Sequence, residues 1–315
     1  MKRFLALVSS ITLIVLAFQV MGQVNPSDPN YEQMKINRQI PTPGQVAPPS
    51  RPAKVIAPDQ DPNRAVGLLI PRDGSFILAM DPNDDLSTGQ IQLPFSFCLF
   101  NLEYSTCYIN NNGNISFDQP YWTYVPTGFP ISGFPMVAAF WADVDTRTST
   151  ECPYNGSVWY KIQTNPNRLI VIWEEVGYFS IHCNLVNTFE IILTDGNDPF
   201  IGFNNNVAFS FADMQWTTGD INGVGGFGGT NGPATVGINK GDGVFYALVG
   251  RFGHAGTDYN LPLDLNAGVS WLDEKDFKFD ACVGDIVVTP FASWALYIGI
   301  GLILGVAIFR YRKLF

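Results

Sequence analysis

The feature that most constrains the fold is an apolar run that ends in two carboxylates, MVAAFWADVDTR at residues 136–147. The run has the length and the small and aromatic residues of a buried strand. Side chains two positions apart on a strand point to the same face, so Asp143 and Asp145 should project together where the apolar run stops. The run therefore predicts the centre of a β domain, with two acids at one end of a buried strand.

Short apolar segments rich in Phe, Val, Ile and Trp continue from about residue 67 to residue 282, and clusters of Gly, Asn, Asp and Pro separate them. This pattern is typical of antiparallel β proteins. The turn NNGN between two such segments predicts a hairpin, because Asn and Gly tolerate positive φ. We expect a mainly β, antiparallel, β-sandwich-like domain with few helices. The candidate strands are residues 90–100, 106–109, 115–117, 136–142, 157–163, 168–176, 187–194, 207–211, 234–238 and 244–248.

Several longer motifs occur in a fixed order along these segments. They are DPNDD at 81–85, YINNNGNISF at 108–117, VAAFWADVDT at 137–146, IVIWEEVGYF at 170–179 and LVNTFEIILTDG at 185–196. Their order and content resemble the nidogen-like extracellular domain, or NIDO domain. The resemblance implies a nidogen-type, mostly β module at residues 67–283, of the kind found in extracellular adhesion and matrix proteins and without a known catalytic role.

The N-terminal part of the chain divides into two segments of different composition. We predict a signal peptide at residues 1–22, because two basic residues are followed by an apolar stretch and then by small residues that suit a cleavage site. A retained membrane anchor is the alternative. Residues 23–66 are rich in proline and poor in aromatic side chains. This composition offers too little apolar surface to offset the entropy of ordering, so we expect a disordered linker there.

The C-terminal part contains an uncharged apolar stretch followed by basic residues. Its length predicts a transmembrane helix at residues 290–309. The basic cluster RYRK follows, so the positive-inside tendency predicts a cytoplasmic tail at residues 310–315 and an outward-facing main domain. The alternatives are a buried core helix and a cleaved sorting signal. We expect a single-pass membrane protein whose main domain is extracellular or periplasmic and displayed at the cell surface.

Five cysteines fit an oxidising compartment. Cys98 and Cys107 lie on two successive candidate strands, where a bridge across the hairpin is geometrically reasonable. Cys152 and Cys183 lie in loops that emerge at the same end of an expected three-stranded meander, so they form the second candidate pair. Cys282 is left over, as a free thiol or as a partner in an intermolecular disulfide.

Two groups of carboxylates are candidate metal ligands. Asp81, Asp84 and Asp85 share one loop, and Asp143 and Asp145 share one strand end. Carboxylate oxygens are ligands that Ca²⁺ prefers, although no twelve-residue calcium loop is present and acids at strand ends commonly bind backbone amides instead. We assign no metal ligand firmly and expect no cofactor, with calcium as the one candidate at these five residues.

Motifs of catalytic sites are missing from the sequence. It contains no GxSxG elbow, no HExxH helix and no pair of CxxC motifs, so we expect no catalytic residue and no enzyme. Asn114 and Asn155 begin glycosylation sequons, which matter only if the host glycosylates such sites.

These features together indicate a non-enzymatic surface protein for adhesion or cell-matrix interaction. Five of the 18 basic residues lie in the two terminal segments, so the central part is more acidic than the net charge of −10 suggests, and nucleic acid is not an expected partner. We expect an extracellular protein or glycan ligand, membrane attachment through the C-terminal span, and self-association as a further option. The alternatives are a secreted carbohydrate-active hydrolase or accessory protein, and a structural envelope component.

Overall fold

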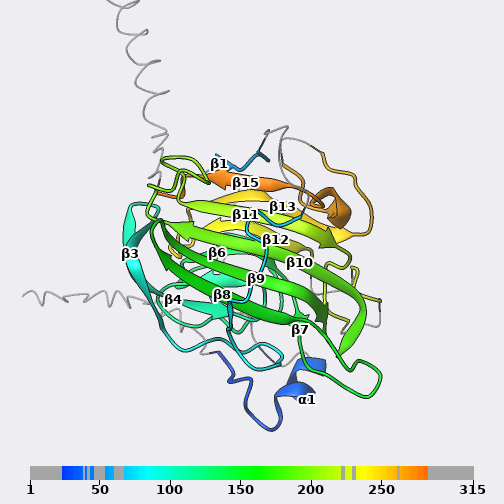
Figure 1. Cartoon of the computed structure of the whole chain (residues 1–315). Helices are drawn as coiled ribbons and strands as arrows, with labels where there is room; N and C mark the ends of the chain where they lie inside the picture. Colours follow the sequence, from blue (N-terminus) through cyan, green and yellow to red (C-terminus); the bar gives the residue numbers. More distant parts are fainter. Residues whose placement is uncertain are drawn as a thin grey trace, which may run out of the picture.

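The computed structural model of the protein describes residues 23–37, 40, 43–45, 54–59, 67–220, 224–228, 232–260 and 263–282 (Figure 1). The elements in chain order are α1 (Tyr31–Ile36), β1 (Lys54–Val55), β2 (Ile77–Leu78), β3 (Ile91–Leu99), β4 (Leu102–Asn110), β5 (Asn114–Ser116), β6 (Met136–Trp141), β7 (Val144–Asp145), β8 (Ser157–Thr164), β9 (Asn167–Tyr178), β10 (His182–Thr194), β11 (Val207–Met214), β12 (Ala234–Asn239), β13 (Tyr246–His254), β14 (Ala267–Gly268), the 3₁₀ helix η1 (Val269–Trp271) and β15 (Asp276–Phe279).

The strands form two sheets that lie over one another (Figure 1). The first sheet has the order β1-β13-β12-β6-β5-β4-β3, with β14 beside β13. The second has the order β15-β11-β10-β9-β8-β2, with β7 beside β9. Pairing is antiparallel except where the two-residue strands β1 and β14 join β13. Neighbouring strands are often successive in sequence, as expected for hairpin connections.

Strand β6 is the buried strand that the apolar run predicted, and all its residues are buried. Val137 and Ala139 face the core between the two sheets, whereas Met136 and Ala138 belong to a second apolar cluster on the other face. A register shift relative to β12 then turns Phe140 into the main core as well. Burial on both faces explains why this segment shows no alternation of apolar and polar residues.

The main core lies between the two sheets. Phe97 and Phe140 enter it from the first sheet, and Trp173, Phe189 and Phe209 enter it from the second. The ring of Trp173 stacks on that of Phe189 at a centroid distance of 5.1 Å, and the rings of Phe140 and Phe189 lie 5.7 Å apart. Aromatic pairs of this kind contribute about 0.5–1.5 kcal/mol beyond their burial, so they help to fix the two layers against each other.

A segment of irregular chain that includes Leu69 and Ile70 covers the outer face of the second sheet, where these side chains pack on an apolar cluster. Beneath it lies Glu190 of β10, which is fully buried. Its Oε2 accepts hydrogen bonds from Ser210 Oγ at 2.8 Å and from the Ile70 backbone N–H at 3.3 Å. Burial raises the pKa of Glu190 to about 8, so the carboxyl is largely protonated at neutral pH.

The predicted class, mainly β with antiparallel sheets and very few helices, is confirmed. A strand is present at each of the ten predicted positions, with ends that differ by a few residues. The strands that sequence reasoning missed are β1, β2, β7, β14 and β15, which are two to four residues long. Segments this short carry no periodicity of their own, because neighbouring strands determine where they form.

The prediction of a disordered linker at residues 23–66 is wrong for the described parts of that range. Residues 23–37, which we call the N-terminal arm, contain α1, and Tyr31 and Lys35 of α1 are buried. The Gln23 side chain also donates to Pro120 O at 2.5 Å and accepts from the Trp122 backbone N–H at 2.6 Å. Composition was misleading because individual polar contacts, and not a large apolar area, hold the arm on the domain.

The cysteine pairing differs in part from the prediction. Cys152 is bonded to Cys183, as expected, but Cys98 is bonded to Cys282 and not to Cys107. Cys282, predicted to be unpaired, follows β15 and lies beside the end of β3, whereas Cys107 is a buried free thiol within the main core. The sequence suggested the hairpin pair because the two strands are neighbours. It did not show that Cys107 faces inward.

Three predictions concern segments that lie outside the described residues. These are the signal peptide at residues 1–22, the transmembrane helix at residues 290–309 and the cytoplasmic tail at residues 310–315. Within the part of the chain that is described, no helix has the length and apolar character needed to cross a bilayer.

The cysteine pairing predicts a specific labelling pattern. In the native protein an alkylating reagent should modify no cysteine of the described residues, because four are in disulfides and burial raises the pKa of the Cys107 thiol to about 12. After unfolding without reductant, Cys107 alone should be labelled. Non-reducing peptide mapping by mass spectrometry measures both states, and a Cys98–Cys107 peptide would contradict the pairing.

The buried carboxyl of Glu190 predicts a dependence of stability on pH. Since the folded-state pKa of about 8 exceeds the ordinary value of 4.5, the folded state binds the extra proton, and stability falls as pH rises through about 8. Glu190→Gln cannot ionise. Relative to the parent protein it should gain about 3–5 kcal/mol between pH 5 and pH 9 in urea unfolding. Glu151→Gln, at an exposed position, should gain nothing, and parallel curves for parent and Glu190→Gln would refute the effect.

Candidate functional site

Two acidic segments that are distant in sequence meet at one end of β6. Asp84 and Asp85 lie in the loop between β2 and β3, while Asp143 and Asp145 follow β6. A bridge between the backbones of Asp84 and Asp145 holds the two segments side by side. All four acids are buried. Asp81, the fifth predicted ligand, is exposed, so the fold brings together four of the five residues that the sequence singled out.

The ammonium group of Lys35 lies among three of these carboxylates. Its Nζ is 2.6 Å from Asp143 Oδ1, 2.7 Å from Asp85 Oδ2 and 2.9 Å from Asp84 Oδ1. The same Nζ lies 4.2 Å from the ring centroid of Phe179 and 4.5 Å from that of Tyr124. The lysine is fully buried, so the carboxylates and the ring faces take the place of water around its charge.

Two further contacts attach the arm to this cluster. Tyr31, one helical turn before Lys35, donates its hydroxyl to Asp85 Oδ2 at 2.8 Å. Arg147 Nη2 lies 2.7 Å from Asp145 Oδ2, and Arg147 Nη1 lies 2.5 Å from Glu32 Oε1 in α1. Helix α1 therefore presents Lys35 and Tyr31 to buried carboxylates and Glu32 to the guanidinium group of Arg147. We call Lys35, Arg147 and the four buried aspartates the ion cluster.

The predicted turn at residues 111–114 supports the ion cluster from the opposite side. Asn112 Nδ2 donates to Asp85 Oδ1 at 2.6 Å, and Asn112 Oδ1 accepts from the Val144 backbone N–H at 2.9 Å. Gly113 has a φ of +75°, and a Cβ there would lie 1.9 Å from Phe140 O. Only glycine fits this turn, and the turn is what places Asn112 between the two acidic segments.

The charges of the ion cluster are strongly coupled. Burial opposes the charge of Lys35, but attraction by Asp143, Asp84 and Asp85 outweighs it and raises the pKa of the ammonium well above its usual value. Burial, with repulsion from Asp85, also raises the pKa of both Asp84 and Asp143. Asp143 Oδ2 is buried without a hydrogen-bond partner among the described residues, so Lys35, which binds Oδ1, is the group that offsets the burial of this carboxyl.

This geometry bears on the predicted calcium ligands. Asp84, Asp85 and Asp143 have oxygens close enough to hold one metal ion. The Lys35 ammonium lies in the space that such an ion would take, and Arg147 binds Asp145. A calcium ion would therefore have to displace the N-terminal arm before it could reach these oxygens.

Other groups that the sequence singled out are also engaged. Asn155 is buried and donates Nδ2 to Asp145 O at 2.7 Å, and Asn114 is buried and accepts from Asn110 Nδ2 at 2.7 Å. Neither asparagine is accessible for glycosylation in the folded domain.

Sequence reasoning missed the cations of the site. Lys35 and Tyr31 lie in the segment read as a disordered linker, and Arg147 was seen only as the end of the apolar run. The one available signal was their spacing, since Tyr31 and Lys35 lie four residues apart and so share a helix face. Nothing in the sequence paired that face with acids 49 to 108 residues further along.

The ion cluster predicts that Lys35 is essential for stability. Lys35→Met keeps an apolar stem but leaves three buried carboxylates without their counter-charge, so it should cost about 3 kcal/mol or more in unfolding free energy at pH 7. Lys161→Met, which removes a partly exposed lysine 3.4 Å from Asp73, should cost less than about 1 kcal/mol. Thermal unfolding and protease cleavage within the arm measure the difference. Equal losses for the two variants would contradict the assigned role.

Comparisons with known proteins relate the chain to one family of domains. The family model described as "NIDO related" matches residues 73–261. Alpha-tectorin of Gallus gallus is 32% identical over 188 residues, which is 50% of this chain and 8% of that protein. Nidogen of Drosophila melanogaster is 26% identical over 230 residues, which is 64% of this chain and 16% of that protein. This chain thus matches only a small part of each relative.

No solved structure gives a significant match. The family model nevertheless covers more than half of the chain, from the segment before β2 to the segment after β13, and so includes the four aspartates of the ion cluster. The predicted resemblance is confirmed, and the chain belongs to the NIDO-related family.

Proposed function

We propose that this protein displays its NIDO-related domain outside the cell and acts, without catalysis, in adhesion or cell-matrix interaction. The observation that carries the proposal is the family match over residues 73–261, a range that contains the motifs named in the sequence analysis. The resemblance implies an extracellular module of adhesion and matrix proteins. Two disulfides within the described residues support an oxidising compartment.

The ion cluster supports a structural role for the acids near β6. A general acid or base must reach the substrate, and here the carboxylates are buried beneath the N-terminal arm with Lys35 and Arg147 as partners. A carbohydrate-active hydrolase, the first alternative, would need paired acids in an open cleft. The buried aspartates of the ion cluster do not lie in such a cleft. A structural envelope component is the other alternative, and it would show as self-association of the purified chain.

The described chain ends close to the predicted membrane span. Cys282 is tied to Cys98 of β3, and the proposed transmembrane helix begins at residue 290. The few residues between them reach at most about 25 Å when extended, at about 3.5 Å per residue. An anchored domain would therefore stay near the membrane surface, where many copies can act together and weak contacts add up.

Binding of the purified full chain to an array of matrix proteins and glycans tests the proposal. We expect saturable binding to at least one matrix protein or glycan and no chemical change in the bound molecule. Binding should be the same in calcium and in a calcium chelator, because Lys35 lies among the predicted calcium ligands. Turnover of an array component, without stable binding to any, would overturn the proposal. Binding that requires calcium would restore the metal hypothesis.

A further inference from the structure

A second group of polar side chains surrounds a cavity of about 570 Å³ at the other end of β10 from the ion cluster. Phe179, which precedes β10, contacts Lys35, whereas Asp195, which follows β10, lines the cavity. Residues from β3, β4, the start of β9, the loop between β10 and β11, and the chain after β15 complete the walls. The volume falls in the range of about 300–1,000 Å³ that is usual for small-molecule sites.

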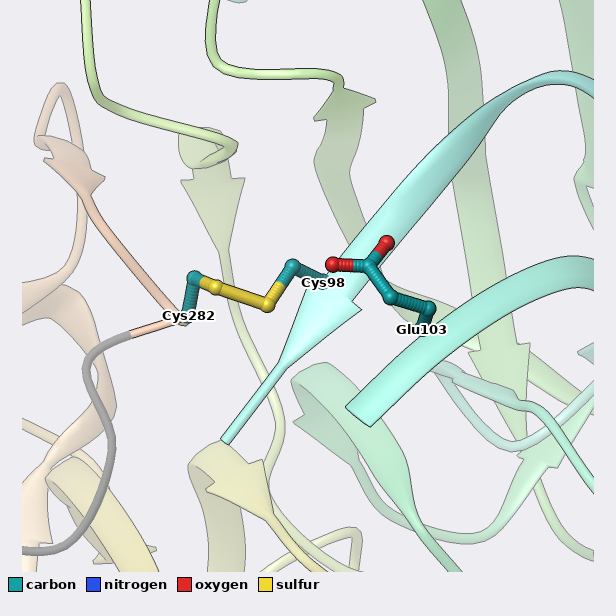
Figure 2. Close-up of side chains that lie close together, drawn as sticks. All are labelled: Cys98, Glu103 and Cys282. Carbon is teal, nitrogen blue, oxygen red and sulfur yellow. A yellow bond between two sulfur atoms is a disulfide. The ribbon is translucent and has the colours of Figure 1, made fainter. Parts of the chain in front are cut away.

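One wall of the cavity is formed by the Cys98–Cys282 disulfide, with Glu103 beside it (Figure 2). Cys98, Cys282 and Glu103 come close enough to suggest a metal site. The two sulfurs are bonded to each other, however, and supply no thiolate, which is the form that binds metals. The disulfide instead fixes β3 against the chain that follows β15, so it holds two walls of the cavity together.

The cavity is lined by acceptors that are held in place. Asp195 Oδ2 accepts from Asn167 Nδ2 at 2.8 Å, and Asp195 Oδ1 accepts from the Asn197 backbone N–H at 3.0 Å. Burial opposes ionisation of Asp195, but these hydrogen bonds outweigh it and lower its pKa, so it remains an anionic acceptor. Glu103 Oε2 accepts from Ser96 Oγ. Asp195 is thereby held by Asn167 and Asn197, and Glu103 is held by Ser96, while the carboxylate oxygens keep lone pairs for a ligand.

Amide groups lie next to these carboxylates. The backbone of Asn204 is fixed by donation to Gly196 O at 2.8 Å, and its side chain is exposed and makes no hydrogen bond to any described residue. Its amide can therefore both donate to and accept from a ligand. An aromatic side chain belongs to the lining as well, since Phe95 of β3 is one of its residues.

The charge of the lining restricts the ligand. Glu103, Asp195 and Asp280 line the cavity, and none of its described lining residues is a lysine, an arginine or a histidine. Phosphate, sulfate and carboxylate groups would be repelled. A hydroxyl group donates and accepts at once, so it suits a lining in which carboxylates accept and amides do both. The C–H faces of a sugar ring pack well on aromatic side chains.

We propose that this cavity binds a neutral carbohydrate, with Glu103 and Asp195 accepting from sugar hydroxyls and Asn204 bonding at the rim. This inference rests on the proposed function and gives its partner a chemical class: uncharged glycans, to the exclusion of sialylated, uronic-acid and sulfated ones.

The test compares neutral and acidic glycans on the same array with the purified full chain. We expect binding to neutral oligosaccharides of hexoses or N-acetylhexosamines. Glu103→Gln, which keeps the shape of the side chain, and Asn204→Gly, which keeps the φ of +71°, should each weaken affinity about tenfold in calorimetry. The matched control is Glu151→Gln, at an exposed glutamate outside the cavity, which should bind as the parent does.

The outcomes separate this inference from the proposed function. Binding of a matrix protein that the cavity variants leave unchanged, without neutral-glycan binding, would overturn the inference and leave the function standing. Preference for acidic glycans, or equal affinity of the cavity variants and the control, would also overturn it. If the chain instead binds a lysine-rich peptide and Glu103→Gln weakens that binding, the partner of the cavity is cationic and the carbohydrate inference is wrong. Failure to bind any protein or glycan would defeat both proposals.

Discussion

The ammonium group of Lys35, held by three buried aspartates, is the interaction on which the rest of this domain depends. It joins the N-terminal arm, the loop after β2 and the end of β6, which are segments 49 to 108 residues apart. A buried charge is costly unless it is paired and hydrogen-bonded, and here neither partner can be removed without exposing the other to that cost. The arm is therefore an integral part of the fold, although it lies outside the family match.

The sequence predicted the sheets well because their signals are local. The apolar run of β6, the Asn112-Gly113 turn and the other short apolar segments each determine their own structure over a few residues. It predicted the site only in part. Asp143 and Asp145 were expected to share a face, and they do meet Asp84 and Asp85, but the cation came from a segment whose composition suggested disorder. Cys98 illustrates the same limit, since its partner lies 184 residues away and the closer candidate faces the core.

The two polar regions at the ends of β10 differ in what surrounds their acids. In the ion cluster each acid meets a lysine, an arginine, a tyrosine or an asparagine of the chain, and the side chains of the acids are closed off from water. In the cavity beside Cys98 the acids are held by neutral neighbours and are left without a basic partner in the lining. The first arrangement stabilises the protein, whereas the second is suited to meet groups from outside. Acidic residues of one domain can thus serve opposite purposes according to the cations that the fold supplies.

The bond between Cys98 and Cys282 also bears on how the protein is made. A chain that crosses a membrane from its N-terminus delivers Cys98 and Cys107 to the oxidising side long before Cys282 arrives. During that interval the two early thiols are the nearest available partners, and their premature union would keep Cys107 out of the core that it occupies in the finished domain. Under the proposed export, a molecule that formed this early bond would reach the native pairing only by thiol exchange, which a disulfide isomerase would speed.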